Sequence, residues 1–562
     1  PELVQQLRYR KGPYFAEDGD FASAGSAHIE LRRNLDAGLA QVTAGPGAYV
    51  RTLLADSPKA SPDATGQWLY GLELFHNDGP WTVPENYRKR NGVLRYSEGT
   101  AVQGWAITAM AYQGRWTSTD QVPQRALDSR LLGRYDSLDP TAGGVTQRYS
   151  LSGEWSQLQA GVHRKTRLWA LQSALDLWSN FTYCLTDERL ACPVGDQFQQ
   201  SERRTAAGGE HSRHWASTWQ GREVRHAWGV QVRADDLAPV GLYRTQQRTR
   251  LTTVREDRVQ QQSLGVWAES EVRWNDWLRT TAGGRADAYR FQVRSSWAAN
   301  SGQAQNALLS PKLSVVFGPW RGMEGYVNHG QGFHSNDARG TTQTVDPVDP
   351  TTAVRPVSPL VRTRGEEIGL RSQWWPGWTS TLALWQLRMA SELLFVGDAG
   401  TTEPTRPSLR RGVEWSHFIA LNRHWAIDAD LSWSQARFKD ADPAGPHIPG
   451  AASTTANLGL SWDGQGPWSG ALRLRYWGPR PLVEDNSLRS PAAAWVNLRV
   501  GYRTTERDQW TLDVYNLMDR KVDDIAYAYV SRLAGEPAQG VMDVHVHPAE
   551  PRTWRVRWAH RF

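Results

Sequence analysis

The two histidines of the segment DVHVHP, His545 and His547, are the residues whose type and spacing most directly suggest chemistry. At positions i and i+2 of an extended segment, both imidazoles point the same way and could hold a metal ion or the edge of a haem. A third ligand has to come from elsewhere in the chain, and the candidates are His211, His214 and His447. The alternative, which we favour, is a polar segment with two incidental histidines, so the identity of any metal stays open.

A second candidate site is the carboxylate pair Glu484 and Asp485, which follows Arg480 in the segment YWGPRPLVEDNSLRS. These side chains could bind a substrate at the mouth of a larger structure, or they could hold two parts of the chain together. The alternative is a turn after a strand, in which the carboxylates accept hydrogen bonds from nearby backbone groups. We favour the turn.

Motifs of the common enzyme classes do not occur. The segment DPTAGG lacks the Lys-Ser/Thr ending of a phosphate-binding P-loop. The sequence contains neither a G-x-S-x-G nucleophile elbow nor an H-E-x-x-H zinc-binding helix. It therefore supports no enzymatic activity and calls for no cofactor.

The chain has two cysteines, Cys184 and Cys192, in the polar segment YCLTDERLACP. A small disulfide-closed loop in an oxidising compartment is favoured over two free thiols. A metal site is disfavoured there because no histidine is close in sequence.

The elements that must position these residues follow one pattern, seen best in the last ten residues, TWRVRWAHRF. Because side chains alternate along a strand, one face carries Trp554, Val556, Trp558, His560 and Phe562. The other face carries Arg555, Arg557 and Arg561. A globular core would require partners for buried charges, whereas a barrel with lipid outside and water inside accommodates both faces. We predict the closing strand of a bacterial outer-membrane β-barrel, with Arg555 and Arg557 toward the lumen, the aromatic face toward the bilayer, and Phe562 as the assembly signal.

The same alternation recurs along the chain, in residues 223–233, 264–274, 425–433, 472–476, 496–503 and 510–514. Short turns such as Asn275-Asp276 suit one end of a barrel, and long polar connections suit the other. The expected long connections are residues 118–146, 184–217, 334–362, 397–411, 438–453 and 519–552.

Composition agrees with a barrel. The mean hydropathy of the 562 residues is −0.59, and we find no apolar stretch of the roughly 18 residues that a membrane-spanning helix requires. The 29 Trp and 18 Tyr suit aromatic girdles at two membrane interfaces. The net charge is +6. The basic residues are dispersed along the chain among 58 acidic residues and form no concentrated patch, so no nucleic-acid partner is expected.

The first 33 residues, PELVQQLRYRKGPYFAEDGDFASAGSAHIELRR, resemble the final segment of the plug domain of TonB-dependent outer-membrane receptors. The resemblance rests on a strand leading into Gly12-Pro13, on the spaced Gly19 and Gly25, and on a further strand around Ile29. Other stretches are similar to one subfamily of these receptors: STDQVPQRALDS, SLDPTAGGVTQRYSLSGEW, GDQFQQ, YWGPRPLVEDNSLRS and DVYNLMDRKVDDIAYAYVSRLAGEP.

This resemblance implies an all-β protein of the bacterial outer membrane, with a large antiparallel transmembrane barrel of 22 strands in residues 34–562 and the end of a plug in residues 1–33. It implies uptake of a small ligand, such as a siderophore or another metal chelate, by active transport. The implied partners are the TonB–ExbB–ExbD energy-coupling complex, the barrel-assembly machinery and outer-membrane lipid. Which ligand is carried stays open, because one fold serves many ligands.

One departure from the family pattern leaves alternatives. Most of the plug, including the segment presented to TonB, does not occur in this sequence, and we expect the natural protein to carry it. If it does not, the barrel is a passive porin-like channel. A third hypothesis is a secreted or periplasmic Trp-rich protein that binds or hydrolyses carbohydrate and is soluble without detergent.

Overall fold

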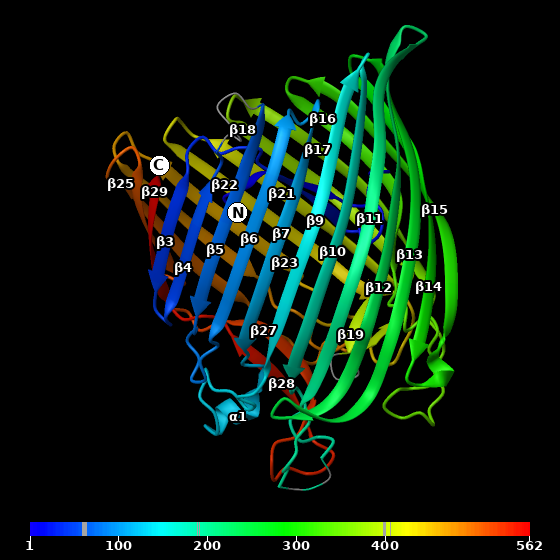
Figure 1. Cartoon of the computed structure of the whole chain (residues 1–562), viewed down its shortest axis with the longest axis vertical. Helices are drawn as coiled ribbons and strands as arrows, with labels where there is room; N and C mark the ends of the chain where they lie inside the picture. The colour runs from blue at the N-terminus through cyan, green and yellow to red at the C-terminus, as the bar shows by residue number, and fades with distance from the viewer. Residues whose placement is uncertain (59–64, 188, 190, 397–400, 405) are drawn as a thin grey trace.

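The computed structural model describes residues 1–58, 65–187, 189, 191–396, 401–404 and 406–562. In this part of the chain, 22 strands form one closed antiparallel barrel, as predicted (Figure 1). The ring closes where the C-terminal strand β29 pairs with β26 on one side and with β3 on the other. Closure leaves no unpaired strand edge, as a sheet surrounded by lipid requires.

The barrel strands are β3 (Leu39–Gly45), β4 (Tyr49–Asp56), β5 (Gly66–Asn77), β6 (Tyr87–Gly99), β7 (Gly104–Thr117), β9 (Gly143–Gln159), β10 (Val162–Ser179), β11 (Phe198–Trp219), β12 (Arg222–Gln246), β13 (Thr249–Asn275), β14 (Leu278–Ser295), β15 (Gly302–Trp320), β16 (Met323–Ser335), β17 (Leu360–Trp375), β18 (Trp378–Met389), β21 (Ser408–Ala420), β22 (Trp425–Phe438), β23 (Thr454–Asp463), β24 (Trp468–Trp477), β25 (Ala493–Arg503), β26 (Asp508–Tyr515) and β29 (Thr553–Arg561).

The other elements are β1 (Val4–Lys11), β2 (Gly25–Leu31), β8 (Val122–Pro123), α1 (Gln124–Asp128), η1 (Ala298–Asn300), β19 (Leu393–Val396), β20 (Thr401–Pro404), β27 (Asp523–Ser531) and β28 (Val541–Pro548). Neither helix in the described residues is long and apolar enough to cross a membrane.

The two faces of the closing strand β29 are arranged as predicted. Arg557 lies opposite Thr43 of β3, and Thr43 lies opposite Arg51 of β4, so the three side chains share one face. Arg51 donates a hydrogen bond of 2.9 Å to the carboxylate of Glu2, which lies inside the barrel. These contacts confirm that the arginine face of β29 points to the lumen. Trp554, on the other face, is 49% exposed.

The C-terminal residue is joined to the start of the barrel. The backbone groups of Gly38 and Phe562 exchange two hydrogen bonds, of 3.0 and 3.1 Å. Arg555 lies over the rings of Tyr49 and Tyr515, at 4.1 and 4.7 Å from their centroids. The last strand is thereby held on both edges and on its lumenal face.

The barrel has a tall side and a low side (Figure 1). The long-strand wall, β10 to β15, has strands of 18 to 27 residues. The short-strand wall, β23 to β26 and β29, has strands of 8 to 11 residues. The prediction of a long connection over residues 184–217 is wrong for residues 198–217, which belong to β11. Those polar residues continue the sheet because β10 and β12 pair with them, and strand pairing does not depend on an apolar face.

Exposed tryptophans ring the end of the barrel that has the short turns. Among them are Trp219, Trp274, Trp277, Trp320, Trp375, Trp425, Trp468 and Trp510. Such a ring is typical of a membrane interface. At the long-loop end, exposed tryptophans occur on β22 and β29 as Trp433 and Trp554, whereas the outward positions of β13, β14 and β15 are mostly Arg and Gln. The expected second aromatic girdle is therefore interrupted on this wall.

Candidate ligand-binding site

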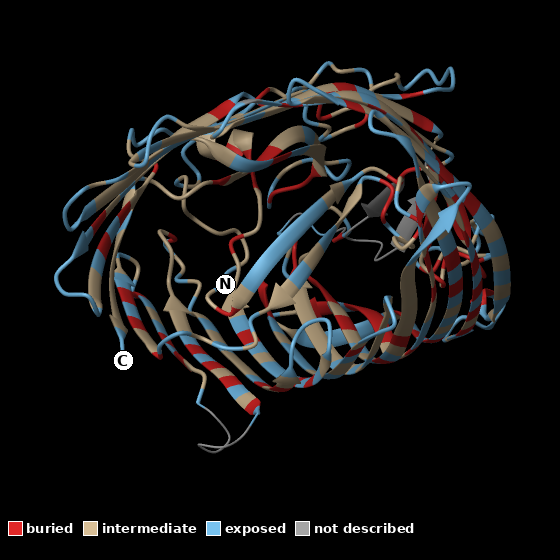
Figure 2. Ribbon diagram, turned by 90° about the horizontal axis from the view of Figure 1, so that it is seen from above, coloured by how far each residue is buried: buried red, intermediate tan, exposed pale blue. Residues whose placement is uncertain are grey.

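The N-terminal segment lies inside the barrel. Strands β1 and β2 pair only with each other, and Figure 2 shows them within the ring of barrel strands. The loop between them, residues 12–24, contacts the long-strand wall. The Lys312 ammonium of β15 donates to the carbonyl of Pro13 at 2.8 Å, and the Arg285 guanidinium of β14 donates to the carbonyl of Glu17 at 3.0 Å.

The same loop is also bonded to β16 and β17. Ser23 and Thr363 share a hydrogen bond of 2.7 Å between their hydroxyls. The Asp20 carboxylate accepts hydrogen bonds from the backbone N–H and the hydroxyl of Ser335, at 2.7 and 2.6 Å. The loop therefore spans part of the lumen and is fixed on several neighbouring strands.

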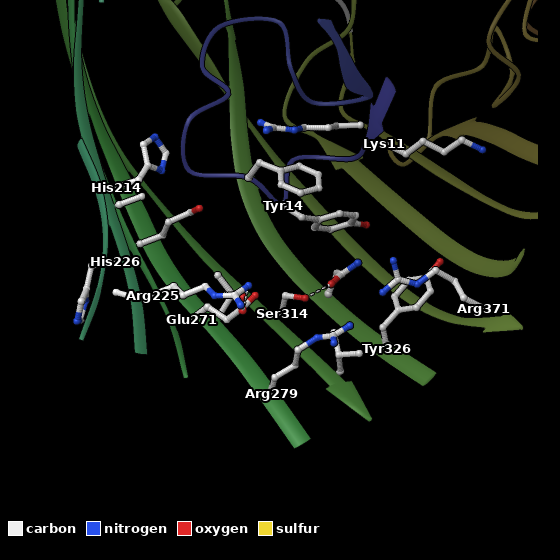
Figure 3. Close-up of a pocket in the computed structure, with 18 of the residues that line it drawn as sticks. Lys11, Tyr14, His214, Arg225, His226, Glu271, Arg279, Ser314, Tyr326 and Arg371 are labelled. Carbon is white, nitrogen blue, oxygen red and sulfur yellow. Dashed lines mark hydrogen bonds and ion pairs between the residues drawn. The ribbon is translucent and has the colours of Figure 1, made fainter. Parts of the chain in front are cut away.

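A turn-side cavity of about 890 Å³ lies between this loop and the short-turn end (Figure 3). Its lining combines arginines with carboxylates. Arg279 donates to Glu324 at 2.8 Å, and the Arg225 guanidinium lies 3.6 Å from the Glu271 carboxylate. The charges of Arg279 and Arg225 are therefore partly neutralised by carboxylates in or next to the lining.

A loop-side chamber of about 720 Å³ lies farther toward the long-loop end. Its lining includes Tyr112, Arg148, Trp169, Arg204 and Arg233. Among the described residues, no carboxylate belongs to this lining, although carboxylates behind it hold two of the arginines.

The arginines of the loop-side chamber differ in how they are held. Asp235 binds Arg233 through two hydrogen bonds, of 2.6 and 2.8 Å, and Arg233 lies 5.9 Å from the Trp169 ring centroid. Glu202 pairs with Arg204 at 3.1 Å. Within the described part of the chain, no ion pair involves Arg148. Guanidinium groups beside aromatic rings suit a planar, anionic ligand.

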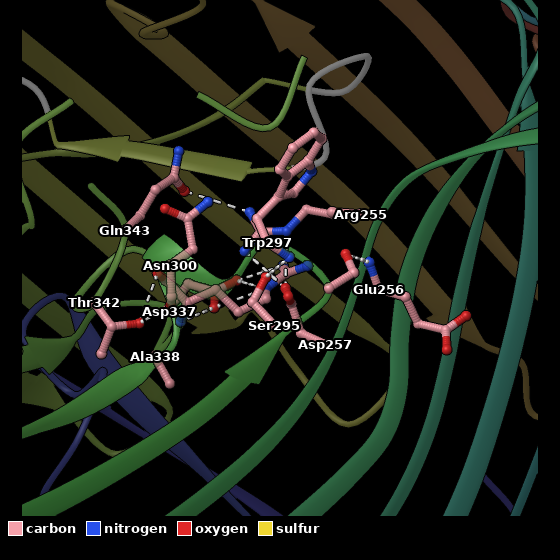
Figure 4. A network of polar contacts seen from close by, with 12 residues as sticks. Arg255, Glu256, Asp257, Ser295, Trp297, Asn300, Asp337, Ala338, Thr342 and Gln343 are labelled. Carbon is pink, nitrogen blue, oxygen red and sulfur yellow. Dashed lines mark hydrogen bonds and ion pairs between the residues drawn. The ribbon is translucent and has the colours of Figure 1, made fainter. Parts of the chain in front are cut away.

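One wall of the lumen is extended by a folded loop, residues 336–359 (Figure 4). The fully buried amide of Asn300 donates to the carbonyl of Val345 at 3.1 Å, and Thr342 donates to the carbonyl of Asn300 at 2.8 Å. Arg255 and Asp257 form a buried ion pair of 2.7 Å beside the loop. Partnered buried groups of this kind fix a loop in one position.

Three further connections form one unit, the loop cap, made of residues 118–142, 180–197 and 516–552. The predicted long connection 519–552 lies between the barrel strands β26 and β29, and its middle is folded. Strands β27 and β28 form a hairpin there, and β28 also pairs with β8. Two residues of this hairpin, Ala526 and Val546, pack in a buried apolar cluster with Val122 and Leu482, which explains why the segment folds.

Polar contacts join the parts of the loop cap. The fully buried Arg532 donates to the carbonyls of Asp187 and Arg189, at 2.5 and 2.9 Å. Arg125 forms two hydrogen bonds of 2.8 Å with Glu536.

The structure contains a disulfide between Cys184 and Cys192. It closes a loop of the cap next to Tyr183, whose backbone carbonyl accepts a hydrogen bond from Asp196 at 2.8 Å. The bonded state is the one favoured from the sequence.

Both histidines of DVHVHP lie on β28 in the loop cap, with different surroundings. His545 is fully buried, shares a 2.7 Å hydrogen bond with Ser531 and stacks on Tyr529 at 3.6 Å. Burial lowers the pKa of His545 to about 4. His547 shares a 2.8 Å hydrogen bond with Asp524. In this conformation His545 has no open side toward a ligand.

The proposed third histidine ligands are elsewhere. His214 lines the turn-side cavity, whereas His211 shares a hydrogen bond of 2.9 Å with Thr166 on the other face of β11. His447 donates its backbone N–H to the carbonyl of Glu484 at 3.0 Å. The described residues include no group of three or more His, Cys, Asp or Glu side chains placed to hold a metal ion.

The carboxylate candidates lie in a loop that connects β24 and β25. Glu484 pairs with Arg406 at 3.0 Å. Asp485 accepts hydrogen bonds from the N–H and hydroxyl of Ser487, which lower the pKa of its carboxyl group. Arg480 donates its backbone N–H to the Ser490 hydroxyl at 3.1 Å. The loop contacts of these side chains match the turn that we favoured, and their role toward a ligand stays a prediction.

Sequence reasoning missed the arginines of the loop-side chamber. Arg148, Arg204 and Arg233 come from β9, β11 and β12, and nothing in a single sequence gives the register that brings them to one height. Arg148 and Arg204 lie outside the alternating segments recognised above, so only Arg233 gave a signal, through its position on the polar face of residues 223–233. Arg233 ended one of the segments recognised above, and its neighbours on other strands could not be identified.

The chain matches one family model, described as TonB dependent receptor-like, beta-barrel, over residues 29–517. A search among curated proteins by sequence finds no significant match.

Solved structures with the same fold include three receptors. The ferric yersiniabactin uptake receptor FyuA from Yersinia pestis has a TM-score of 0.78 and 16% identity, with 100% of this chain and 85% of that chain covered. The ferric preacinetobactin receptor BauA from Acinetobacter baumannii has a TM-score of 0.78 and 14% identity, with 100% of this chain and 86% of that chain covered. The ferric-catecholate import receptor Fiu from E. coli K12 has a TM-score of 0.76 and 14% identity, with 98% of this chain and 85% of that chain covered. At this identity the likeness establishes the fold.

Proposed function

The chain belongs to the TonB-dependent receptor-like β-barrel family, and we propose that it is an outer-membrane receptor that takes up a scarce ligand by TonB-coupled active transport. The observation that carries this proposal is the loop-side chamber, which is lined by three arginines and two aromatic rings. Two of these residues, Trp169 and Arg233, also line the adjoining space that the loop of the N-terminal segment borders. A chamber above an obstruction can hold a ligand before work is done to admit it.

The ligand that best fits the loop-side chamber is an anionic metal chelate with planar, ring-bearing arms, such as a siderophore complex. Arg148, Arg204 and Arg233 supply donors for carboxylate or phenolate oxygens, while Trp169 and Tyr112 offer flat apolar surfaces. The chamber volume of about 720 Å³ lies within the range of small-molecule sites. Solved neighbours named as ferric-chelate receptors agree with this class.

In this proposal residues 1–33 are the end of a plug, and the TonB–ExbB–ExbD complex supplies the work that moves it. The contacts of Lys312, Arg285 and Thr363 hold the segment in the lumen at rest. Phe562 acts as the signal read by the barrel-assembly machinery. The site residues on the loops, including Glu484, Asp485, Arg480 and His547, serve to shape the entrance.

Uptake of radiolabelled ferric chelates by cells tests the proposal. The full-length gene is expressed in an outer-membrane receptor-deficient strain, with and without TonB. The proposal predicts TonB-dependent accumulation of an anionic chelate, and loss of accumulation for the Arg204→Ala/Arg233→Ala variant with normal barrel assembly. Accumulation that is equal without TonB would indicate a passive channel instead.

A further inference from the structure

The outward face of β13, β14 and β15 carries a regular polar grid at its long-loop end. We call this grid the Arg–Gln patch; it consists of Arg258, Gln260, Gln262, Arg290, Gln292, Arg294, Gln303 and Gln305. All but Gln292 are exposed, and Gln292 is half-buried. The strands pair in continuous register through this region, so these side chains are direct neighbours.

The direction of the patch follows from the lumenal contacts of the same strands. Arg285 of β14 binds the N-terminal segment inside the barrel, and so does Glu269 of β13, which accepts a hydrogen bond from the Ala16 N–H at 3.4 Å. Side chains at even positions of β14 therefore point outward, and so do those at even positions of β13. Arg258, Arg290 and Arg294 occupy such positions.

The patch joins the lipid-facing surface directly. Two positions beyond Gln262 on the same face of β13 comes Leu264, which is 46% exposed, followed by Val266 at 45%. On β15, Leu309 lies four residues beyond Gln305 on the same face and is 62% exposed. Each strand thus changes from polar to apolar at one level, as expected where lipid headgroups meet acyl chains.

The charge of the patch is only partly balanced by its neighbours, among which are Asp236 and the exposed Glu256, two positions from Arg258 on the same strand. Arg258 and Arg294 lie directly opposite one another, an arrangement of like charges that destabilises a sheet. Arg258 pairs with Asp236 at 2.7 Å, and Arg290 donates to Gln303 at 3.2 Å. Among the described residues, no carboxylate pairs with Arg290 or Arg294. An anion between the strands would remove the repulsion.

A second pair of opposed arginines lies at the long-loop end. Arg88 of β6 and Arg115 of β7 are directly opposite and exposed at the same end of the barrel. They lie on the outer face, because Lys89, one position along, forms an ion pair inside the barrel with Glu73, which is bound by Arg51. Outward basic pairs thus occur on two separate parts of the circumference.

We propose that the Arg–Gln patch binds the headgroup of a phosphorylated glycolipid in the outer leaflet of the membrane. Arg258, Arg290 and Arg294 would bind the phosphate oxygens, for which guanidinium forks are the best match. The five glutamine amides both donate and accept hydrogen bonds, as sugar hydroxyls require. The acyl chains would lie along the apolar surface that begins at Leu264. This inference rests on the membrane location in the proposed function.

Binding of bis-phosphorylated lipid A to the purified full-length protein in detergent micelles tests the proposal. The test variant is Arg258→Gln/Arg290→Gln/Arg294→Gln. The matched control is Arg164→Gln/Arg213→Gln/Arg222→Gln, which removes the same charge from outward positions at the short-turn end of the long-strand wall. Occupancy is measured by native mass spectrometry across a lipid titration.

We expect at least a tenfold loss of lipid A affinity in the test variant and less than a twofold change in the control. Dephosphorylated lipid A and phosphatidylglycerol should bind the wild type at least tenfold more weakly than lipid A. Wild-type affinity in the test variant would overturn the proposal, and so would equal binding of dephosphorylated lipid A or of phosphatidylglycerol. The wild-type comparison does not depend on how the variant folds. Since no transported ligand or TonB is present, failure here leaves the uptake proposal to its own test.

Discussion

The inner and outer faces of β13, β14 and β15 carry charges of very different kinds. On the inner face, three charged side chains form hydrogen bonds with the N-terminal segment: Glu269, Arg285 and Lys312. On the outer face the Arg–Gln patch is exposed and opens onto an apolar surface. In our two proposals, the same strands serve two functions through side chains at adjacent positions. A substitution one residue along the chain should therefore affect a different property.

The largest expected effect comes from the inner face. Asp287 is 1% exposed at its side chain and pairs with Arg285 at 2.8 Å. Asp287→Ala should lower the free energy of unfolding by about 3–5 kcal/mol, because it leaves a buried guanidinium without its partner. The outward control on the same strand, Arg290→Gln, should change it by less than about 0.5 kcal/mol. Guanidinium-induced unfolding of the protein in lipid vesicles measures both, and equal effects would contradict the assigned faces.

The next prediction locates the apolar boundary on the outer face. Val266→Arg should cost about 2–4 kcal/mol of folding free energy in a bilayer, whereas Gln262→Arg, nearer the headgroups, should cost about 0–1 kcal/mol. The measurement is reversible folding into lipid vesicles. If the two variants are equally destabilised, the polar and apolar parts of β13 do not lie at different depths.

A smaller effect is expected in the loop cap, which stands at the long-loop end of the barrel. Cys184→Ser/Cys192→Ser opens a loop of eight-residue separation and should lower local stability by about 2–3 kcal/mol. Hydrogen exchange should become faster for the amides of β27 and β28 and stay unchanged in β13. Faster exchange throughout the barrel would show that the cap and barrel unfold together.

The smallest effect is a pH dependence of the loop cap. The folded protein keeps His545 neutral down to about pH 4, whereas an unfolded chain binds a proton below about pH 6.5. The cap should therefore lose about 1 kcal/mol of stability between pH 6.5 and 5.5. Burial raises the pKa of Asp120 to about 6, which acts in the opposite sense.

The contribution of His545 is isolated by comparing the wild type with His545→Gln. Hydrogen exchange of β27 and β28 should accelerate more on acidification in the wild type than in the variant. An identical pH response in both proteins would mean that His545 is not held neutral by the cap.

The barrel could be predicted because alternation is local. In β29 each residue's face follows from its position, and Arg557 and Trp554 lie as expected. The length of β11 could not be predicted. Its polar residues adopt a strand because the neighbouring strands β10 and β12 pair with them, and a single sequence does not show that pairing. The hairpin β27–β28 within the long connection 519–552 could not be predicted, because its core partners, such as Val122, are far away in sequence.

The proposed binding residues are brought together by the barrel register, which a single sequence does not specify. Arg148 and Arg233 are 85 positions apart in the chain and line one chamber. The histidine pair drew attention through its spacing, but His545 is surrounded by its own loop. Spacing identifies side chains on one element, whereas this site is assembled across several.

Equilibrium dialysis of the purified full-length protein against radiolabelled ferric chelates of different charge tests the central claim most directly. We predict saturable binding of an anionic, ring-bearing chelate, weakened at least tenfold by Arg204→Ala/Arg233→Ala and unchanged by Arg258→Gln/Arg290→Gln/Arg294→Gln. Equal binding of anionic, neutral and cationic chelates, or equal affinity in the inner-face variant, would contradict the assignment of the loop-side chamber.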